Sequence, residues 1–184
     1  MRVSKEKAAE NRERILNAAA ALMREHGISG VGVDALSEAA GLTHGGLYSR
    51  FGSKDRLMAE ALQQALDGNA SVSAAARDFK SYVNGYLSPR HRDTPGEGCA
   101  LAALGAEIAR SSPAARKSFT DGLRRLVEAV AQLMQRNSKA AKTDDALATL
   151  STLVGALTLA RAVDDPQLSD RILAAARRSL LSPR

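Results

Sequence analysis

The stretch from Thr43 to Lys54, THGGLYSRFGSK, concentrates side chains that can bind an anionic polymer. It combines hydroxyl groups, an imidazole, an arginine and a lysine, which can contact phosphate oxygens or the edges of bases. Gly45 and Gly46 lie among them, although a glycine inside a helix costs about 1 kcal/mol relative to alanine. The paired glycines therefore predict a place where another molecule comes close to the backbone.

No other group of residues in the sequence predicts catalysis or metal binding. The chain has one cysteine, which excludes an internal disulfide and a zinc site built from cysteines. Its three histidines lack the spacing of metal ligands, and neither a GxxxxGK loop nor a Ser–His–Asp grouping can be recognised. We therefore expect no enzymatic activity, no metal and no cofactor.

The elements that position these side chains are expected to be helices throughout. Apolar residues make up 45% of the chain and aromatic residues only 3%, so the core must consist mainly of Ala, Leu, Val and Ile. These residues recur at helical spacing, and no segment alternates with period two for long enough to form a strand. Caps and glycines indicate one helix that ends at 26 and eight more at about 33–40, 44–51, 54–66, 75–87, 99–110, 113–136, 145–163 and 168–181. A break or a soft spot is expected at 67–69, and a polar loop at 88–98. The fold class is therefore all-α, with about nine helices.

The segment 33–51 has the form of a helix-turn-helix, because a turn containing Gly41 separates two short helices. In this motif the first turn of the second helix enters the major groove of DNA. The paired glycines fall in that turn, where small residues let the backbone approach base edges and phosphates. Tyr48 follows one turn later, and its hydroxyl is suited to a phosphate oxygen. Lys54 opens the next helix, whose positive N-terminal end also favours phosphate.

The segment GVDALSEAAGLTHGGLYSRFGSKDRL resembles the DNA-binding domain of the TetR/AcrR family of transcriptional regulators. In that family an Ala-Gly-hydrophobic-Ser/Thr turn precedes a helix ending in Tyr-x-x-Phe, followed by Ser-Lys-Asp/Glu-x-Leu. The matching residues are Ala40, Gly41, Leu42, Thr43, Tyr48, Phe51, Ser53, Lys54, Asp55 and Leu57. The family usually has Thr or Ser as the cap before Val33, and here Gly32 takes that place. Glycine is only a slightly poorer cap.

The resemblance implies a DNA-binding domain at 8–68 and an effector-binding and dimerisation domain at 69–184. Its partner would be a double-stranded DNA operator. The residues expected to contact DNA are Thr43, His44, Gly45, Tyr48, Arg50, Ser53 and Lys54. Of these, His44 is expected near a base edge and Arg50 near the backbone.

In the family, the last two helices pair with their copies to form a dimer, and the corresponding segments here carry apolar stripes. The stripe residues that we assign to this interface are Leu150, Val154, Leu157, Leu168 and Ile172. A two-fold homodimer places two recognition helices about one DNA turn apart, ~34–36 Å, which matches a palindromic operator. The alternative is that these stripes pack only within one chain.

The family also implies a mostly apolar pocket for a small-molecule effector, enclosed by helices between about 57 and 136. Tyr82 and Tyr86 are candidate residues of its wall. Binding of the effector would favour a spacing of the DNA-binding heads that no longer fits both half-sites. The sequence does not distinguish repression from activation, and the family implies repression as its commoner mode.

Cys99 opens a predicted helix, where unpaired N–H groups favour a thiolate. Some regulators that resemble this protein sense electrophiles or oxidants through a cysteine in the second domain. Cys99 is therefore an alternative sensor, although a free cysteine is often only a small buried apolar residue.

The formal net charge of +6 agrees with an anionic partner. A basic helical adaptor that binds other proteins remains the alternative. Salt separates the two, because DNA binding weakens steeply as salt rises whereas apolar contacts between proteins do not. The chain has neither the roughly 18 uninterrupted apolar residues of a membrane span nor an apolar segment behind the charged N-terminus, so we expect a cytoplasmic protein without membrane contact.

Overall fold

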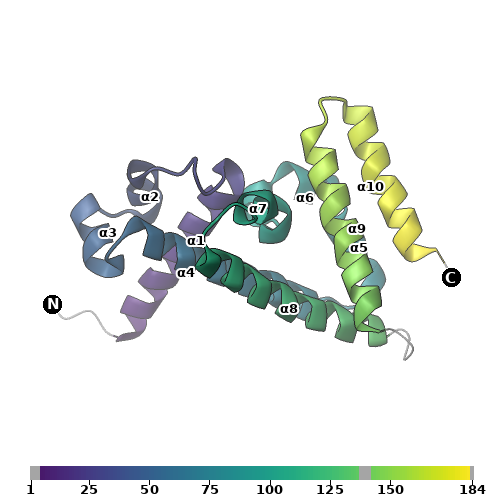
Figure 1. The fold of residues 1–184 in the computed structure, drawn as a ribbon, viewed down its shortest axis with the longest axis horizontal. Helices are drawn as coiled ribbons and strands as arrows, with labels where there is room; N and C mark the ends of the chain where they lie inside the picture. Colours follow the sequence, from purple (N-terminus) through teal and green to yellow (C-terminus); the bar gives the residue numbers. More distant parts are fainter. Residues whose placement is uncertain (1–4, 137–141, 183–184) are drawn as a thin grey trace.

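The computed structural model describes residues 5–136 and 142–182, which form ten α-helices and one short 3-10 helix without any strand (Figure 1). The elements are α1 (Lys5–His26), α2 (Val33–Ala40), α3 (His44–Phe51), α4 (Lys54–Ala75), α5 (Phe79–Tyr86), α6 (Pro89–Asp93), η1 (Pro95–Glu97), α7 (Ala100–Ile108), α8 (Pro113–Gln135), α9 (Thr143–Ala162) and α10 (Pro166–Leu181). The expected all-α class is confirmed. The segment predicted as a polar loop at 88–98 instead contains α6 and η1.

Helices α1, α2 and α3 form a small unit that shares its core with the start of α4. The side chains at its centre are Ile15, Leu36, Leu47, Phe51 and Leu57, all of which are fully buried. Glycines end the two short helices, since Gly41 and Gly52 adopt φ values of +64° and +78°, which side chains with a Cβ rarely accept. The turn between α2 and α3 therefore has the geometry of a helix-turn-helix.

Helix α4 runs without interruption through 67–69, so of the two alternatives predicted there the break is wrong. Its partner is α8, and Figure 1 shows the two long helices running side by side. They approach closely at Gly122, where an added Cβ would lie 2.7 Å from the Cβ of Leu66. This packing stabilises α4 across Gly68. As a result, one rigid helix crosses the predicted domain boundary at 68/69.

Helices α9 and α10 form an antiparallel pair at the opposite end of the molecule from α2 and α3 (Figure 1). The Asp165 side chain begins α10 by accepting hydrogen bonds from the backbone N–H groups of Gln167 and Leu168. No helix within the described part of the chain combines the length and the apolar character needed to cross a membrane.

Candidate DNA-binding surface and effector cavity

Helix α3 is held by two buried side chains and presents its other faces to solvent. Leu47 and Phe51 insert into the core, whereas Tyr48 and Arg50 are exposed, Tyr48 with 46% of its surface accessible. An aromatic side chain so far exposed on an eight-residue helix contributes little to the core. Tyr48 and Arg50 are therefore placed to contact a molecule outside the fold.

The two adjacent glycines of α3 have different environments. A Cβ at Gly46 would lie 3.3 Å from the hydroxyl oxygen of Thr43, which is a tight contact within the chain. A Cβ at Gly45 would meet nothing within 4 Å, Gly45 is exposed, and its φ is not in the left-handed region. The fold of this chain thus gives no reason for a glycine at position 45.

Two hydroxyl groups cap the helices that border this surface. The Thr43 hydroxyl accepts a hydrogen bond from the Gly46 N–H, and the Ser53 hydroxyl accepts one from the Arg56 N–H, both at 3.1 Å. A hydroxyl that accepts a bond can still donate one. Thr43 and Ser53 therefore both begin a helix and retain a proton for an external acceptor such as phosphate.

His44 is engaged on the protein itself. Its Nε2 lies 2.7 Å from a carboxylate oxygen of Asp34 on α2, and both side chains are exposed. A base contact by His44 would compete with this pair, and it stays a prediction.

Arginines of α1 support the helix-turn-helix in a way that sequence reasoning missed. The Arg12 guanidinium lies over the Phe51 ring, 4.7 Å from its centroid, and pairs with Glu60 of α4. Arg14 donates a hydrogen bond to the Ala40 carbonyl at 3.3 Å, at the end of α2. Only the repeated arginines of α1 hinted at this role, since spacing alone does not tell which partner an arginine will find.

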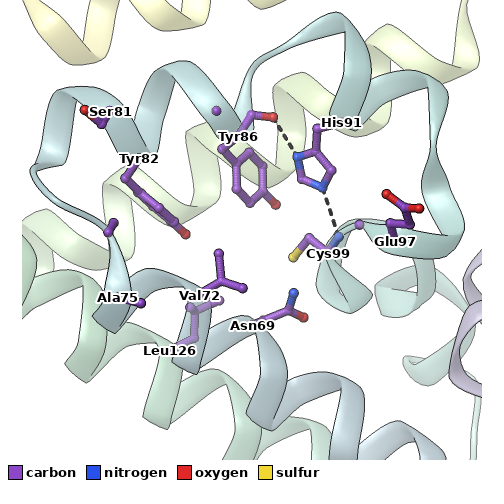
Figure 2. A pocket seen from close by; sticks show the side chains of 13 residues that line it. Asn69, Val72, Ala75, Ser81, Tyr82, Tyr86, His91, Glu97, Cys99 and Leu126 are labelled. Carbon is purple, nitrogen blue, oxygen red and sulfur yellow. Dashed lines mark hydrogen bonds between the residues drawn. The ribbon is translucent and has the colours of Figure 1, made fainter. Parts of the chain in front are cut away.

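A cavity of about 490 Å³ lies between α4, α5, α8 and the segment from α6 to the start of α7 (Figure 2). Its walls include all three residues that the sequence suggested for a pocket or sensor, Tyr82, Tyr86 and Cys99. The other lining residues are Asn69, Val72, Ala75, Ala76, Ser81, Gly85, His91, Glu97, Gly98 and Leu126. Among these, Asn69 and His91 are polar residues that the sequence analysis did not single out.

His91 joins the two sides of the cavity. Its Nδ1 lies 2.7 Å from the Tyr86 carbonyl oxygen, and its Nε2 accepts a hydrogen bond from the Cys99 N–H at 3.0 Å, as the dashed lines in Figure 2 show. Because Nε2 accepts, the proton of the neutral ring must be on Nδ1, which donates to the carbonyl. Burial lowers the pKa of His91 and thereby favours this neutral form.

The two tyrosines remain protonated at neutral pH. Burial raises the pKa of Tyr82 to about 12 and also raises the pKa of Tyr86, to which the neighbouring Cys99 contributes. The Tyr86 hydroxyl is buried, and within the described part of the chain its only neighbouring acceptor is the Cys99 thiol, which accepts weakly.

Cys99 is 2% exposed and caps α7 through its backbone. Two arginines of the segment before Cys99 pair elsewhere: Arg90 lies 3.5 Å from Glu97 at the surface, and Arg92 lies 2.7 Å from Asp170 of α10. The described residues contain no cluster of three or more side chains that could hold a metal ion.

The wall of the cavity is also tied to α1. Arg24, near the end of α1, donates from Nε to the Gly96 carbonyl of η1 at 2.7 Å, and its Nη2 donates to the same oxygen. Glu107 of α7 accepts a hydrogen bond from the Ile28 N–H, in the loop after α1, at 2.9 Å. Helix α1 and the loop after it are thus hydrogen-bonded to η1 and α7, the two elements on either side of Cys99.

The stripe assigned to a dimer interface divides into core and surface residues. Leu150 and Leu157 are fully buried within one chain, so they cannot offer surface to a second copy, and this corrects their assignment. Val154 and Ile172 are half-buried, and Leu168 is 40% exposed. The reason is that apolar residues at helical spacing occur both on the face of α9 that packs against the rest of the chain and on its outer face. The spacing alone does not tell the two faces apart. Leu147 and Leu159 of α9, which were not assigned, are also exposed.

Comparison with known proteins agrees with this geometry. Residues 15–61 match the family model for bacterial regulatory proteins of the tetR family. The reduced form of NemR from E. coli superimposes with a TM-score of 0.76 at 18% identity, over 94% of this chain and 95% of that one. A TetR transcription regulator from Chloroflexus aurantiacus gives 0.74 at 22% identity, over 96% and 97%. A TetR-family regulator from Cytophaga hutchinsonii gives 0.73 at 19% identity, over 98% and 96%.

No curated protein matches the chain significantly in sequence. The structural likenesses therefore define the fold, while the sequence match covers the helix-turn-helix and its flanking helices. The sequence match thus identifies residues 15–61 as a helix-turn-helix domain of the tetR family, and the described chain as a whole has the fold of the TetR-family regulators compared with it.

Proposed function

We propose that the protein is a dimeric repressor that binds a palindromic DNA operator and leaves it when a small molecule occupies the cavity. The observation that carries this proposal is the surface of α3. There Tyr48 is exposed beside Gly45, whose missing side chain the protein's own packing does not require. A helix that approaches a groove wall closely is the simplest cause of such a glycine.

Two connections support a coupling between the cavity and DNA. Helix α4 begins at Lys54 beside the proposed DNA surface and lines the cavity with Asn69 and Val72. Helix α1 is attached to the cavity wall through the Arg24–Gly96 hydrogen bonds. A ligand that shifts α4 or the Arg24–Gly96 contact would change the orientation of the helix-turn-helix unit formed by α1, α2 and α3. Allosteric coupling of this kind typically amounts to about 1–3 kcal/mol.

The direct test is selection of DNA from a random pool by the purified protein. We expect an inverted repeat whose half-sites are centred about one helical turn apart, roughly 10–10.5 base pairs. Selection of a single unrepeated motif would contradict a two-fold dimer on DNA. Absence of any enrichment would contradict the operator itself and favour the adaptor alternative.

Repression is tested with the selected operator placed across a promoter in a purified transcription system. Addition of the protein should lower transcript yield, and a variant that has lost operator binding should not. An increase in transcript would identify an activator.

The alternative of thiol sensing through Cys99 gains one observation, because the residue lines the cavity although it is 2% exposed. A reagent would have to enter the cavity to reach it. The test is titration with N-ethylmaleimide while release of the operator is followed, in wild type and in Cys99→Ser. Release in wild type alone would support sensing. Equal release in both proteins, or none in either, would leave Cys99 as a packing residue.

A further inference from the structure

We propose that the cavity selects an uncharged, mostly apolar molecule carrying one hydrogen-bond acceptor, such as a ketone oxygen, and that the Tyr86 hydroxyl donates to that acceptor. This inference rests on the effector site of the proposed function and names the chemical class of its ligand.

The first step is the state of Tyr86. The residue is 8% exposed, its hydroxyl has no hydrogen-bond partner within the described residues, and Figure 2 shows the ring directed into the cavity. The neighbouring Cys99 thiol is only a weak acceptor. Because burial raises the pKa of Tyr86, the hydroxyl keeps its proton and acts as a donor. A buried donor with so weak an acceptor costs free energy, and a ligand oxygen would relieve that cost.

The second step concerns the other polar groups of the wall. Both nitrogens of His91 are already engaged, by the Tyr86 carbonyl and by the Cys99 N–H. The Asn69 carbonyl oxygen accepts from the Ala100 N–H at 3.0 Å, so its amide nitrogen is the part that remains to donate. The Tyr86 hydroxyl and the Asn69 amide nitrogen thus both offer a donor to the cavity, and an acceptor on the ligand would satisfy either of them.

The third step is charge. Glu97 is the only lining residue with an ordinarily charged side chain, and it lies at the surface, where it pairs with Arg90. His91 lines the cavity in its neutral form, because burial lowers its pKa. The guanidinium groups of Arg161 and Arg24 act electrostatically on wall residues, but they do not line the cavity and already donate to backbone carbonyls. An ionised ligand would therefore lose hydration without a charged partner on the cavity wall itself.

The fourth step is size and polarity. A volume of about 490 Å³ suits a small organic molecule. Val72, Ala75 and Leu126 supply apolar wall opposite the tyrosines in Figure 2. The body of the ligand is therefore apolar, and the single acceptor orients it.

Three naphthalene derivatives test the inference by equilibrium dialysis against the full chain without DNA. 2-Acetylnaphthalene carries an acceptor, 2-isopropylnaphthalene has nearly the same shape without one, and 2-naphthoate carries a charge. We expect the ketone to bind most tightly and 2-naphthoate most weakly. Tighter binding of the hydrocarbon or of 2-naphthoate than of the ketone would overturn the proposal, and so would failure of all three to bind.

Tyr86→Phe identifies the donor. It should weaken binding of the ketone about three- to tenfold, the range expected for one hydrogen bond, and leave binding of the hydrocarbon unchanged. Tyr48→Phe, on the exposed face of α3 and outside the cavity, is the matched control and should not alter the ratio of the two affinities. An unaltered ratio in Tyr86→Phe, or an equal change in Tyr48→Phe, would show that Tyr86 is not the donor.

A second measurement needs no ligand. Because the hydroxyl has no partner in the empty protein, Tyr86→Phe should unfold at the same temperature as wild type or higher. A lower melting temperature would mean that the hydroxyl already bonds within the protein and is not available. Since none of these readouts involves DNA, the ligand class can hold even if the ketone fails to release an operator, and in that case only the proposed effector function falls.

Discussion

The two glycines at the start of α3 illustrate how one residue type can have two causes. Gly46 is tight against Thr43 within the chain, whereas a side chain at Gly45 would project into open space. Packing within the chain therefore does not explain a glycine at position 45, and the explanation that we propose is a binding partner. The groove wall of the proposed DNA operator would leave no room for a side chain there.

Gly45→Leu tests this reasoning directly. The side chain should abolish operator binding because it occupies the space of the groove wall. The helix itself gains intrinsic propensity, by less than the roughly 1 kcal/mol that separates glycine from alanine. Binding is measured by fluorescence anisotropy of labelled operator, and stability by urea unfolding. The matched control is Gly68→Leu, a second exposed helical glycine with open space around it, which should bind normally. Equal affinity of both variants would remove the explanation of Gly45.

Tyr48→Phe should weaken binding to all DNA sequences by a similar factor. A hydroxyl on a phosphate positions the protein without reading a base, and one lost hydrogen bond corresponds to about 0.5–1.5 kcal/mol. The measurement is a comparison of affinities for the operator and for a set of single-base variants of it. A loss that depends on one base position would instead make Tyr48 a base-reading residue.

For single residues, the sequence predicts a role where the partner of the side chain lies only a few positions away. The caps at Thr43 and Ser53 follow from hydroxyl chemistry a few residues away and agree with the observed hydrogen bonds. His91 and Asn69 could not be assigned, because their partners lie on other elements and only the packed fold brings them to one cavity.

At the scale of elements, the short helices α5 and α7 are joined by an imidazole rather than by apolar packing alone. The Nε2 of His91 can accept from the Cys99 N–H only when the ring is neutral. Protonation replaces this acceptor with a donor and breaks the connection. The pKa of His91 is lowered by burial, in agreement with this preference.

This arrangement predicts a loss of stability in acid. In the unfolded chain histidine titrates near pH 6.5, so below that value the unfolded state binds a proton that the folded state resists. The free energy of unfolding should therefore fall as the pH drops below about 6.5, until the lower pKa of folded His91 is reached. Urea unfolding between pH 8 and pH 5 measures it. His91→Gln should show a shallower dependence, and an identical dependence in both proteins would contradict the role of His91.

The helices also show where the spacing of apolar residues and glycines is sufficient to predict the bounds of a helix and where it is not. Helix α2 was predicted at its observed bounds because Gly41 ends it locally. The break predicted at 67–69 did not occur, since packing of α8 through Gly122 outweighs the low helix propensity of Gly68. Helix α6 was missed because five residues beginning with proline carry too little periodicity to distinguish a short helix from a loop.

For the whole molecule, the proposed dimer must use the outer faces of α9 and α10. Leu159 and Leu168 are 58% and 40% exposed, whereas Leu157 is part of the core. A carboxylate on each outer face would be buried unpaired in a dimer, and every dimer would contain two copies of each. The double variant Leu159→Glu/Leu168→Glu should therefore sediment as a folded monomer. Val72→Glu, an exposed apolar residue on α4, is the control that should remain dimeric. A dimeric double variant would place the interface elsewhere.

The salt dependence of DNA binding reports how many phosphates the protein neutralises. It therefore shows whether Lys54 contacts DNA from one subunit or from both. Each neutralised phosphate contributes about −0.9 to the slope of log affinity against log salt. In a dimer on two half-sites Lys54 acts twice, so Lys54→Gln should reduce the slope by roughly 1.8. The same substitution in the monomeric double variant on a half-site should reduce it by roughly 0.9. Affinities measured from 50 to 400 mM salt give both slopes. A reduction near 0.9 in the dimer would mean that only one head engages DNA, and no reduction would remove Lys54 from the phosphate contacts.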